Sequence, residues 1–516
     1  MLDQRDHTRR HEPAGANGLS RASHLTDLDD SPRCGDLHPA AGSRGCDLVR
    51  LCRPAGVDHH LDAVANHRSD RRVHGAHMTT TAHVPRISGR LGRTLHLRRA
   101  DPEAPIVVES REPLVYMLCE AAELEHSLMC EYLYAALSLK RSTQEGITET
   151  QLHAIEQWRR AILDVAKQEM LHLAINANLL ASLGASPHLT RPNLPQPSRH
   201  YPTGVTIALL PFSEAALRHF LFMERPEGLT MDDAEGIAAM QHAVPHAGAE
   251  EIAPHLQEFA TVGHLYRSIA DGMTHLSVKW GEERLFLCGH EDEASGALFG
   301  WPELVPITGL NDALRSVETI VEQGEGVAGS WRDAHFGRFL RVLSGFLAER
   351  ERDPEFEPAR PVLPALVRPP ATGEQATLIT DARTARIADV CNVAYEVLLQ
   401  LLYRLFSRVD ETVAQVETLA DVAVSMMFDI VEPLGDLLTR LPVGPEHPNH
   451  TAGPTFELFY EPDYLLPHRR AAWIVTSEHL ALAATVLQPE VASLPELAAV
   501  ESALRDHART LEESAG

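Results

Sequence analysis

Carboxylates and an imidazole stand at positions where two expected helices should bury apolar side chains. Glu125 falls on the apolar face of a helix expected over residues 112–140, and Glu169 and His172 fall on the apolar face of a second helix over 151–180. A buried carboxylate is costly unless it is paired or bound to a metal. Glu169 and His172 form a Glu-x-x-His pair, whose spacing of three places both groups on one helix face. This pattern predicts a metal site.

The ligand types indicate which metal is expected. Hard carboxylates with imidazole and an open coordination position suit iron, or alternatively manganese, that must meet dioxygen. In ferritin-like di-iron bundles each ion takes the His of a Glu-x-x-His pair, and neighbouring helices add further Glu ligands. We therefore expect an iron cofactor, with two ions in the bundle. The alternative is an ion pair between helices, but Lys167 and Arg159 lie off the stripe and fit that role poorly.

Later helices should supply the remaining ligands. Glu224 continues the apolar face of a helix that begins after Ser213, although an ion pair with Arg225 would also explain it. Glu325 continues the apolar face of a helix over 311–325, whereas Glu322 lies one position off that face. His335 follows ten residues after Glu325, so a second Glu-x-x-His would be interrupted by a Gly-rich insertion.

The elements that position these residues are almost all helical. Beyond the bundle, a Pro- and Arg-bearing linker over 353–370 precedes a second helical region over 381–441, where Pro433 should kink or split a long helix. Residues 471–487 are expected to form the last packed helix. The fold class is therefore all-α: a helical bundle with a second, smaller helical region.

The composition divides the chain into three parts. Residues 1–77 contain no Phe, Tyr, Trp, Ile or Lys, so we expect this segment to be disordered or not translated, with translation starting near Met78. Residues 105–350 form the expected metal-binding bundle. Residues 371–490 form the expected C-terminal helical region.

Charge and hydropathy exclude several classes of partner. The net charge of −26 argues against nucleic acid and against an anionic membrane surface. No apolar run is long enough for a transmembrane helix. Seven cysteines without paired spacing favour reduced thiols in a cytoplasmic protein.

An ordered set of motifs extends over roughly residues 105–465. In chain order it comprises Glu123-Leu-Glu-His126, Glu169-Met-Leu-His172, Phe212-Ser-Glu214, Glu224-Arg-Pro-Glu227, Glu322-Gln-Gly-Glu-Gly326, His335-Phe-Gly-Arg-Phe339 and Ala452-Gly-Pro-Thr-Phe456. This set resembles the ferritin-like iminophenyl-pyruvate dimer synthase domain family of violacein and indolocarbazole pathways. The resemblance implies an oxidoreductase of specialised metabolism, of the antibiotic-biosynthesis type, that couples imines of aromatic 2-oxo acids.

Carried over position by position, the resemblance implies a ligand set. The candidates are Glu125, Glu169, His172, Glu325 and His335, with Glu224 and Glu322 next. One departure stands at His264, where the resemblance leads us to expect an acidic residue after Thr261-Val-Gly263.

Two functions from different classes remain open at this point, and a third possibility, an imine-coupling enzyme that uses a haem, is disfavoured because the sequence has no Cys-x-x-Cys-His and no identifiable axial ligand. The leading hypothesis is a non-haem di-iron oxidase or oxygenase that takes dioxygen and an amino-acid-derived or aromatic imine or 2-oxo acid. The alternative is a non-enzymatic iron-binding or scaffold bundle within a biosynthetic complex. The partner is expected to be a small-molecule substrate, and the sequence leaves open a homo-oligomer or a pathway enzyme as a protein partner.

Overall fold

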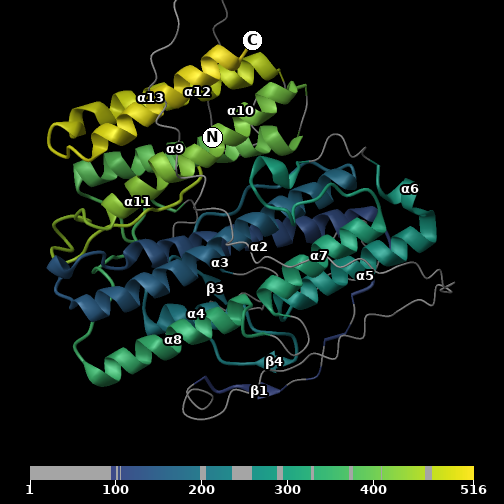
Figure 1. Cartoon of the computed structure of the whole chain (residues 1–516), viewed down its shortest axis with the longest axis horizontal. Coiled ribbons are helices and arrows are strands. Elements are labelled where there is room, and N and C mark those ends of the chain that lie inside the picture. The colour runs from purple at the N-terminus through teal and green to yellow at the C-terminus, as the bar shows by residue number, and fades with distance from the viewer. Residues whose placement is uncertain are drawn as a thin grey trace, which may run out of the picture. The chain divides into compact units, whose positions relative to one another are not determined.

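The described part of the chain is mostly α-helical, as the sequence predicts (Figure 1). The computed structural model describes residues 95–99, 101, 103–104, 106–197, 205–234, 259–287, 294–326, 331–370, 376–407, 410–459 and 468–516. The described residues belong to one compact unit. The expectations for residues 1–77 lie outside the described residues. Within the described ranges, no helix combines the length and apolar character that crossing a membrane requires.

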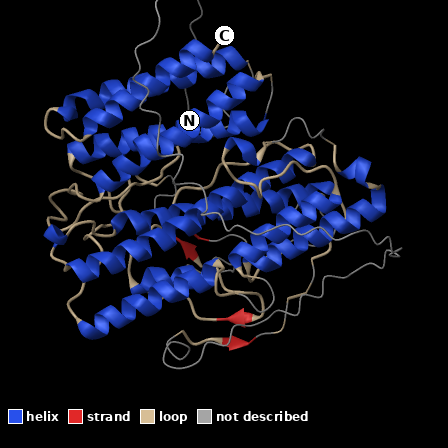
Figure 2. Cartoon of the chain, in the orientation of Figure 1, coloured by secondary structure: helices blue, strands red, loops and turns tan. Residues whose placement is uncertain are grey.

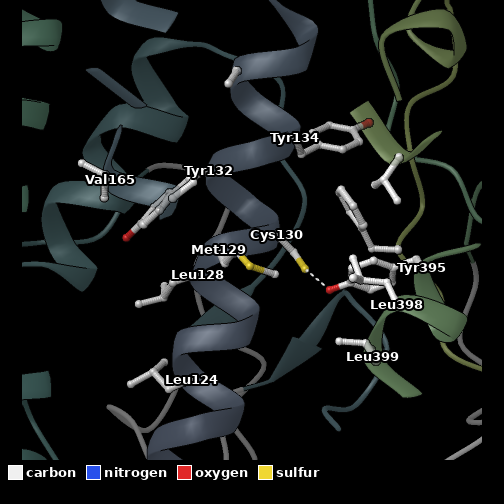
Figure 3. Packing of buried hydrophobic residues seen from close by; sticks show 14 of the residues in the cluster. Leu124, Leu128, Met129, Cys130, Tyr132, Tyr134, Val165, Tyr395, Leu398 and Leu399 are labelled. Atoms are coloured by element: carbon white, nitrogen blue, oxygen red, sulfur yellow. Dashed lines mark hydrogen bonds between the residues drawn. The ribbon is translucent and has the colours of Figure 1, made fainter. Parts of the chain in front are cut away.

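Two long helices, α2 (Arg111–Ser138) and α3 (Glu149–Ser182), pack against each other along their length. Thr148 begins α3 with a reciprocal cap, in which its hydroxyl accepts the N–H of Gln151 and the Gln151 side chain accepts the N–H of Thr148. From Ala121 to Ser138 nearly every residue of α2 is buried, so this helix is covered on all sides. Figure 3 shows the consequence: Leu124 and Tyr132 project to one side of α2, and Cys130 projects to the other.

The remaining bundle helices form two shorter pairs. α4 (Glu214–Met223) packs against α8 (His335–Arg352), and α5 (Val262–Trp280) packs against α7 (Leu310–Gly324). Figure 1 shows these pairs at successive positions along α2 and α3. The break between α4 and α5 and the break between α7 and α8 therefore fall in the middle of the bundle. The short α6 (Glu282–Leu285) follows α5.

A buried histidine connects α4 to α2. The two ring nitrogens of His219 lie 3.2 Å from Glu131 Oε1 and 3.0 Å from Asp233 Oδ1. Burial alone would lower the pKa of His219, but the two carboxylates raise it to about 10. The imidazolium thus compensates the buried Glu131 and the partly buried Asp233.

Strands are few in the described part of the chain (Figure 2). β1 (Arg98–Arg99) pairs with β4 (Leu229–Thr230), and β2 (Gln196–Pro197) pairs with β3 (Thr206–Ile207), both antiparallel. These two-residue ladders fasten connecting segments and contribute no layer of the core.

The second helical region comprises α9 (Ala382–Ser407), α10 (Val413–Met426), α11 (Glu432–Leu438), α12 (Arg469–Val491) and α13 (Leu497–Ser514). A π-helical turn separates α10 from α11, and Pro433 lies in the first turn of α11, so the expected split occurs there. The prediction that residues 471–487 form the last helix is wrong. α13 follows and packs against α12 through buried residues that include Leu497, Leu504 and Leu511.

The linker over residues 353–370 is bonded to the bundle. Lys140 N–H donates to the Pro358 carbonyl at 2.9 Å, and Arg360 N–H donates to the Ser138 carbonyl at 2.8 Å. The Arg360 guanidinium, buried between the two helical regions, reaches Glu145 at 2.7 Å and Asp436 at 3.0 Å. The division into units over 105–350 and 371–490 stays a prediction about independent folding.

Candidate metal centre

Five buried residues from four helices converge at the break in the bundle. Glu125, Glu169 and His172 form one group of potential ligands, and Glu169, Glu224 and His335 form a second. Within each group one ligand atom per residue lies within 4.8 Å of the others. The five side chains are at most 5% exposed. Glu169 belongs to both groups.

The carboxylate of Glu169 is divided between two imidazoles. Its Oε2 lies 2.9 Å from His172 Nδ1, and its Oε1 lies 3.0 Å from His335 Nδ1. The two rings are nearly parallel, with centroids 5.4 Å apart. Glu125 lies 3.4 Å from His172 Nδ1, and Glu224 lies 3.4 Å from His335 Nδ1. Each imidazole therefore faces Glu169 and one further carboxylate.

Each of the outer carboxylates is oriented by a tyrosine. Tyr266 of α5 donates its hydroxyl to Glu125 at 2.6 Å, and Asn176 of α3 donates to Tyr266 at 2.6 Å. Tyr132 of α2 donates to Glu224 at 2.5 Å. The oxygens that face the imidazoles are thus left for another partner.

The far nitrogen of each imidazole meets a glutamine oxygen. His172 Nε2 lies 3.0 Å from Gln323 Oε1, and His335 Nε2 lies 3.2 Å from Gln168 Oε1. With these amide orientations the Nε2–H groups donate, so Nδ1 is the nitrogen directed at the carboxylates. An outer-shell acceptor of this kind fixes the tautomer and ring orientation of metal-binding histidines.

Mutual charge compensation shapes the protonation of the metal-free centre. Burial would lower the pKa of both histidines, but Glu169 with Glu125 raises the pKa of His172 well above its ordinary value, and Glu169 with Glu224 raises that of His335 to about 9. Burial and the Glu169 charge raise the pKa of Glu125 to about 7. Although burial opposes it, the pKa of Glu169 is lowered, chiefly by His335.

The residues present fit a pair of metal ions. Glu169 Oε1 is buried and makes no hydrogen bond of ordinary geometry in the described residues, although it lies 3.0 Å from His335 Nδ1, an arrangement expected of two donor atoms directed at a shared cation. Three carboxylates and two imidazoles are the donor types that iron and manganese prefer. Glu169 would bridge the ions, and each group would add one carboxylate and one histidine.

The structure agrees with some of the predicted ligands and corrects others. It brings together Glu125, Glu169, His172 and His335, and Glu224 joins them at the end of α4. The placement of Glu322 at the site is wrong, because its side chain is exposed on α7.

Glu325 lines the same cavity but joins neither ligand group. Its Oε1 accepts the Gly263 N–H at 2.8 Å, and its Oε2 accepts the Glu227 N–H at 3.1 Å. Burial raises the pKa of Glu325 to about 7, although these N–H groups oppose the shift.

His264 joins neither ligand group and does not line the cavity. His264 Nδ1 contacts Glu103, and its Nε2 donates to the Ala104 carbonyl at 3.1 Å. The cavity wall at this part of α5 is formed instead by Val262, Gly263 and Tyr266.

The orienting residues around the centre are hard to recognise in the sequence. Tyr132 and Tyr266 each occupy a helix face where aromatic rings are ordinary core residues, so their hydroxyl contacts leave no signal. Nothing in the sequence distinguishes Gln168 and Gln323 from glutamines on the surface of a helix. Asn176 had a signal, because it is a polar residue within the apolar stripe of α3.

Comparison with known proteins agrees with this geometry. Residues 118–344 match the family model named Ferritin-like. The chain is 26% identical over 406 residues to dichlorochromopyrrolate synthase of Lentzea aerocolonigenes, covering 72% of this chain and 38% of that protein. It is also 26% identical over 381 residues to 2-imino-3-(indol-3-yl)propanoate dimerase of Chromobacterium violaceum, covering 69% and 35%. The chain thus spans little more than a third of the length of these relatives.

A solved structure of a ferritin-like protein from Caulobacter vibrioides superposes with a TM-score of 0.39 and 19% identity, over 62% of this chain and 96% of that one. The helical architecture, the family match and the two curated relatives confirm the fold and the resemblance expected from the sequence. Residues 118–344 therefore match the Ferritin-like family model, in a helical chain that is similar to dichlorochromopyrrolate synthase and to 2-imino-3-(indol-3-yl)propanoate dimerase.

Proposed function

We propose that the chain is a non-haem di-iron oxidoreductase that uses dioxygen to couple imines of aromatic 2-oxo acids in specialised metabolism. The observation that carries the proposal is the position of Glu169, whose two oxygens face two buried imidazoles from different helices. A carboxylate in this position is suited to bridge two ions. The alternative metal is manganese, which takes the same donors.

The substrate class rests on the relatives. The name of one relative specifies dimerisation of 2-imino-3-(indol-3-yl)propanoate, an imine with an aromatic side chain and a carboxylate. Both matches extend beyond the ferritin-like domain, which supports a shared reaction type in the part of the relatives that this chain covers.

The chain's own residues would have three tasks in this reaction. Glu125, Glu169, Glu224, His172 and His335 would hold the ions, which supply dioxygen reduction when bound. Tyr132 and Tyr266 would keep the outer carboxylates in place through their hydroxyl bonds. The apolar walls formed by Leu128, Ile320 and Val321 would limit water at the centre.

The test combines metal analysis with dioxygen uptake. Protein purified after iron supplementation should contain two iron ions per chain. Adding an aromatic 2-oxo acid together with ammonium, which form the imine in solution, should start dioxygen uptake and yield a coupled product detectable by mass spectrometry. Glu169→Ala should abolish both signals, and Glu123→Ala, which removes a partly exposed carboxylate paired with His188, should leave them unchanged.

The alternative from another class is an iron-binding scaffold in a biosynthetic complex. Such a protein would bind iron without substrate-dependent dioxygen uptake, whereas a storage protein would oxidise ferrous iron and hold many ions per chain. For either function, we propose a soluble protein in the cytoplasm that associates with a pathway enzyme.

A further inference from the structure

The Glu325 carboxylate is held in a defined position beside the metal centre. It is the residue that ends α7, and its two oxygens accept N–H groups from two different segments, Gly263 in the first turn of α5 and Glu227 after α4. The first N–H groups of a helix have no partner within the helix, and they favour an anion. Glu325 therefore supplies a cap for α5 from another part of the chain.

Gly263 provides the space for this cap. A Cβ at position 263 would lie 2.1 Å from Glu325 Oε1 and 2.4 Å from its carboxyl carbon, closer than atoms can approach. The backbone of Gly263 lies within α5 and has no positive φ, so conformation does not require a glycine there. The close approach of the Glu325 carboxylate does.

The cap lies within reach of the ions' expected place. Glu325 and Gly263 line the same cavity as the five ligand residues. The preceding residue, Gly324, is also close, since a Cβ there would lie 3.7 Å from Glu224 Oε2. The centre itself contains three glutamates and two histidines, one carboxylate fewer than the four glutamates and two histidines of di-metal bundles of this type.

We propose that Glu325 has two positions: it caps α5 in the metal-free protein, and it moves to the ions as the fourth carboxylate when they bind. The inference rests on the metal centre proposed above. Because Glu325 terminates its helix, its side chain can move without breaking hydrogen bonds within α7. Metal binding would then free the N–H groups of Gly263 and Glu227 while it tightens the rest of the bundle.

Hydrogen exchange tests whether metal binding loosens the cap on α5 while it protects the amides of the bundle helices. The full chain is loaded with Fe(II) under anaerobic conditions, and amide exchange is followed by mass spectrometry with and without the metal. Amides around Gly263 and Glu227 should exchange several-fold faster with Fe(II), whereas those of α2 and α3 around Glu125 and Glu169 should exchange more slowly. Unchanged or slower exchange at Gly263 and Glu227 with Fe(II) bound would overturn the proposal, and absence of bound Fe(II) would instead refute the metal centre.

Variants provide an independent measurement. Glu325→Gln should weaken Fe(II) binding by at least about tenfold, since even an outer-shell partner contributes about 10–100-fold to metal affinity. Glu322→Gln, an exposed change on the same helix, is the matched control and should leave the affinity unchanged. Gly263→Ala should expel Glu325 from the cap, so that exchange at Glu227 is already fast without metal and no longer responds to it. If Glu325→Gln binds Fe(II) as tightly as the control, Glu325 is only a helix cap; this comparison holds even if Gly263→Ala fails to fold.

Discussion

Replacing Glu169 by alanine is the most direct test of the centre, because Glu169 is the residue shared by both ligand groups. Removing Glu125 or Glu224 takes a carboxylate from one group, whereas removing Glu169 takes one from each. We therefore expect Glu169→Ala to lower bound iron to well under half of the wild-type value. His172→Ala, which affects one group, should lower it less.

The structure also limits how far this substitution can destabilise the metal-free protein. Without Glu169, the buried imidazolium of His335 keeps Glu224 at 3.4 Å as its partner, or it loses its proton. The pKa of about 9 depends on Glu169, so the cost of removing this proton from the wild-type protein at pH 7, on the order of 3 kcal/mol, is an upper bound on what His335 loses in the variant. That is less than the typical unfolding free energy of about 5–15 kcal/mol, so the variant should still fold.

The assay is iron content per chain by elemental analysis, with circular dichroism to check the helical fold. Glu123→Ala on the partly exposed side of α2 is the control, since its carboxylate pairs with His188 and not with the centre. A folded Glu169→Ala protein that retains full iron would show that the metal lies elsewhere or that the cluster is a network of ion pairs, and the scaffold interpretation would then hold.

Three further outcomes are expected. Tyr132→Phe and Tyr266→Phe should each lower iron affinity by about 10–100-fold with an unchanged fold, measured by metal titration, because each removes the hydroxyl that orients a ligand carboxylate. In the metal-free protein, the pKa of His219 raised to about 10 contributes stability that is fully present below about pH 6.5 and lost as pH rises towards 10; His219→Gln should cost about 3–5 kcal/mol at pH 7 and remove this part of the pH dependence in urea unfolding. Limited proteolysis should leave the linker over 353–370 intact despite its Pro-rich composition, because its backbone is bonded to the end of α2; early cleavage there would show that those bonds open readily.

The sequence carried enough information to find most of the centre. A carboxylate or imidazole inside an apolar helical stripe is costly, and this single argument located Glu125, Glu169 and His172. Helix ends are harder to read. The periodicity of its helix predicts Glu325 as a ligand, but α7 ends one residue earlier, and in the metal-free structure the carboxylate accepts the N–H groups of Gly263 and Glu227.

Other features depended on contacts that a single sequence does not show. The hydroxyl of Tyr132 meets Glu224, which is 92 residues away in the chain, and a tyrosine in an apolar stripe otherwise resembles any core residue. α13 has no long apolar run in the sequence, because six of its eighteen residues are charged, although Leu497, Leu504 and Leu511 lie at the spacing of one buried helix face.

The burial of α2 on all sides links the second helical region to the centre. Glu125 faces the ligand groups, whereas the adjacent His126 contacts the Tyr395 hydroxyl, and Cys130 shares a hydrogen bond with it at 3.3 Å (Figure 3). Nearby, Arg191 donates to the Phe456 carbonyl at 2.7 Å. Consecutive residues of a helix point about 100° apart, so Glu125 and His126 meet different neighbours. α9 contacts α2 on the His126 side through Tyr395, and these contacts help to fix the orientation of the helix that supplies Glu125 to the ligand groups.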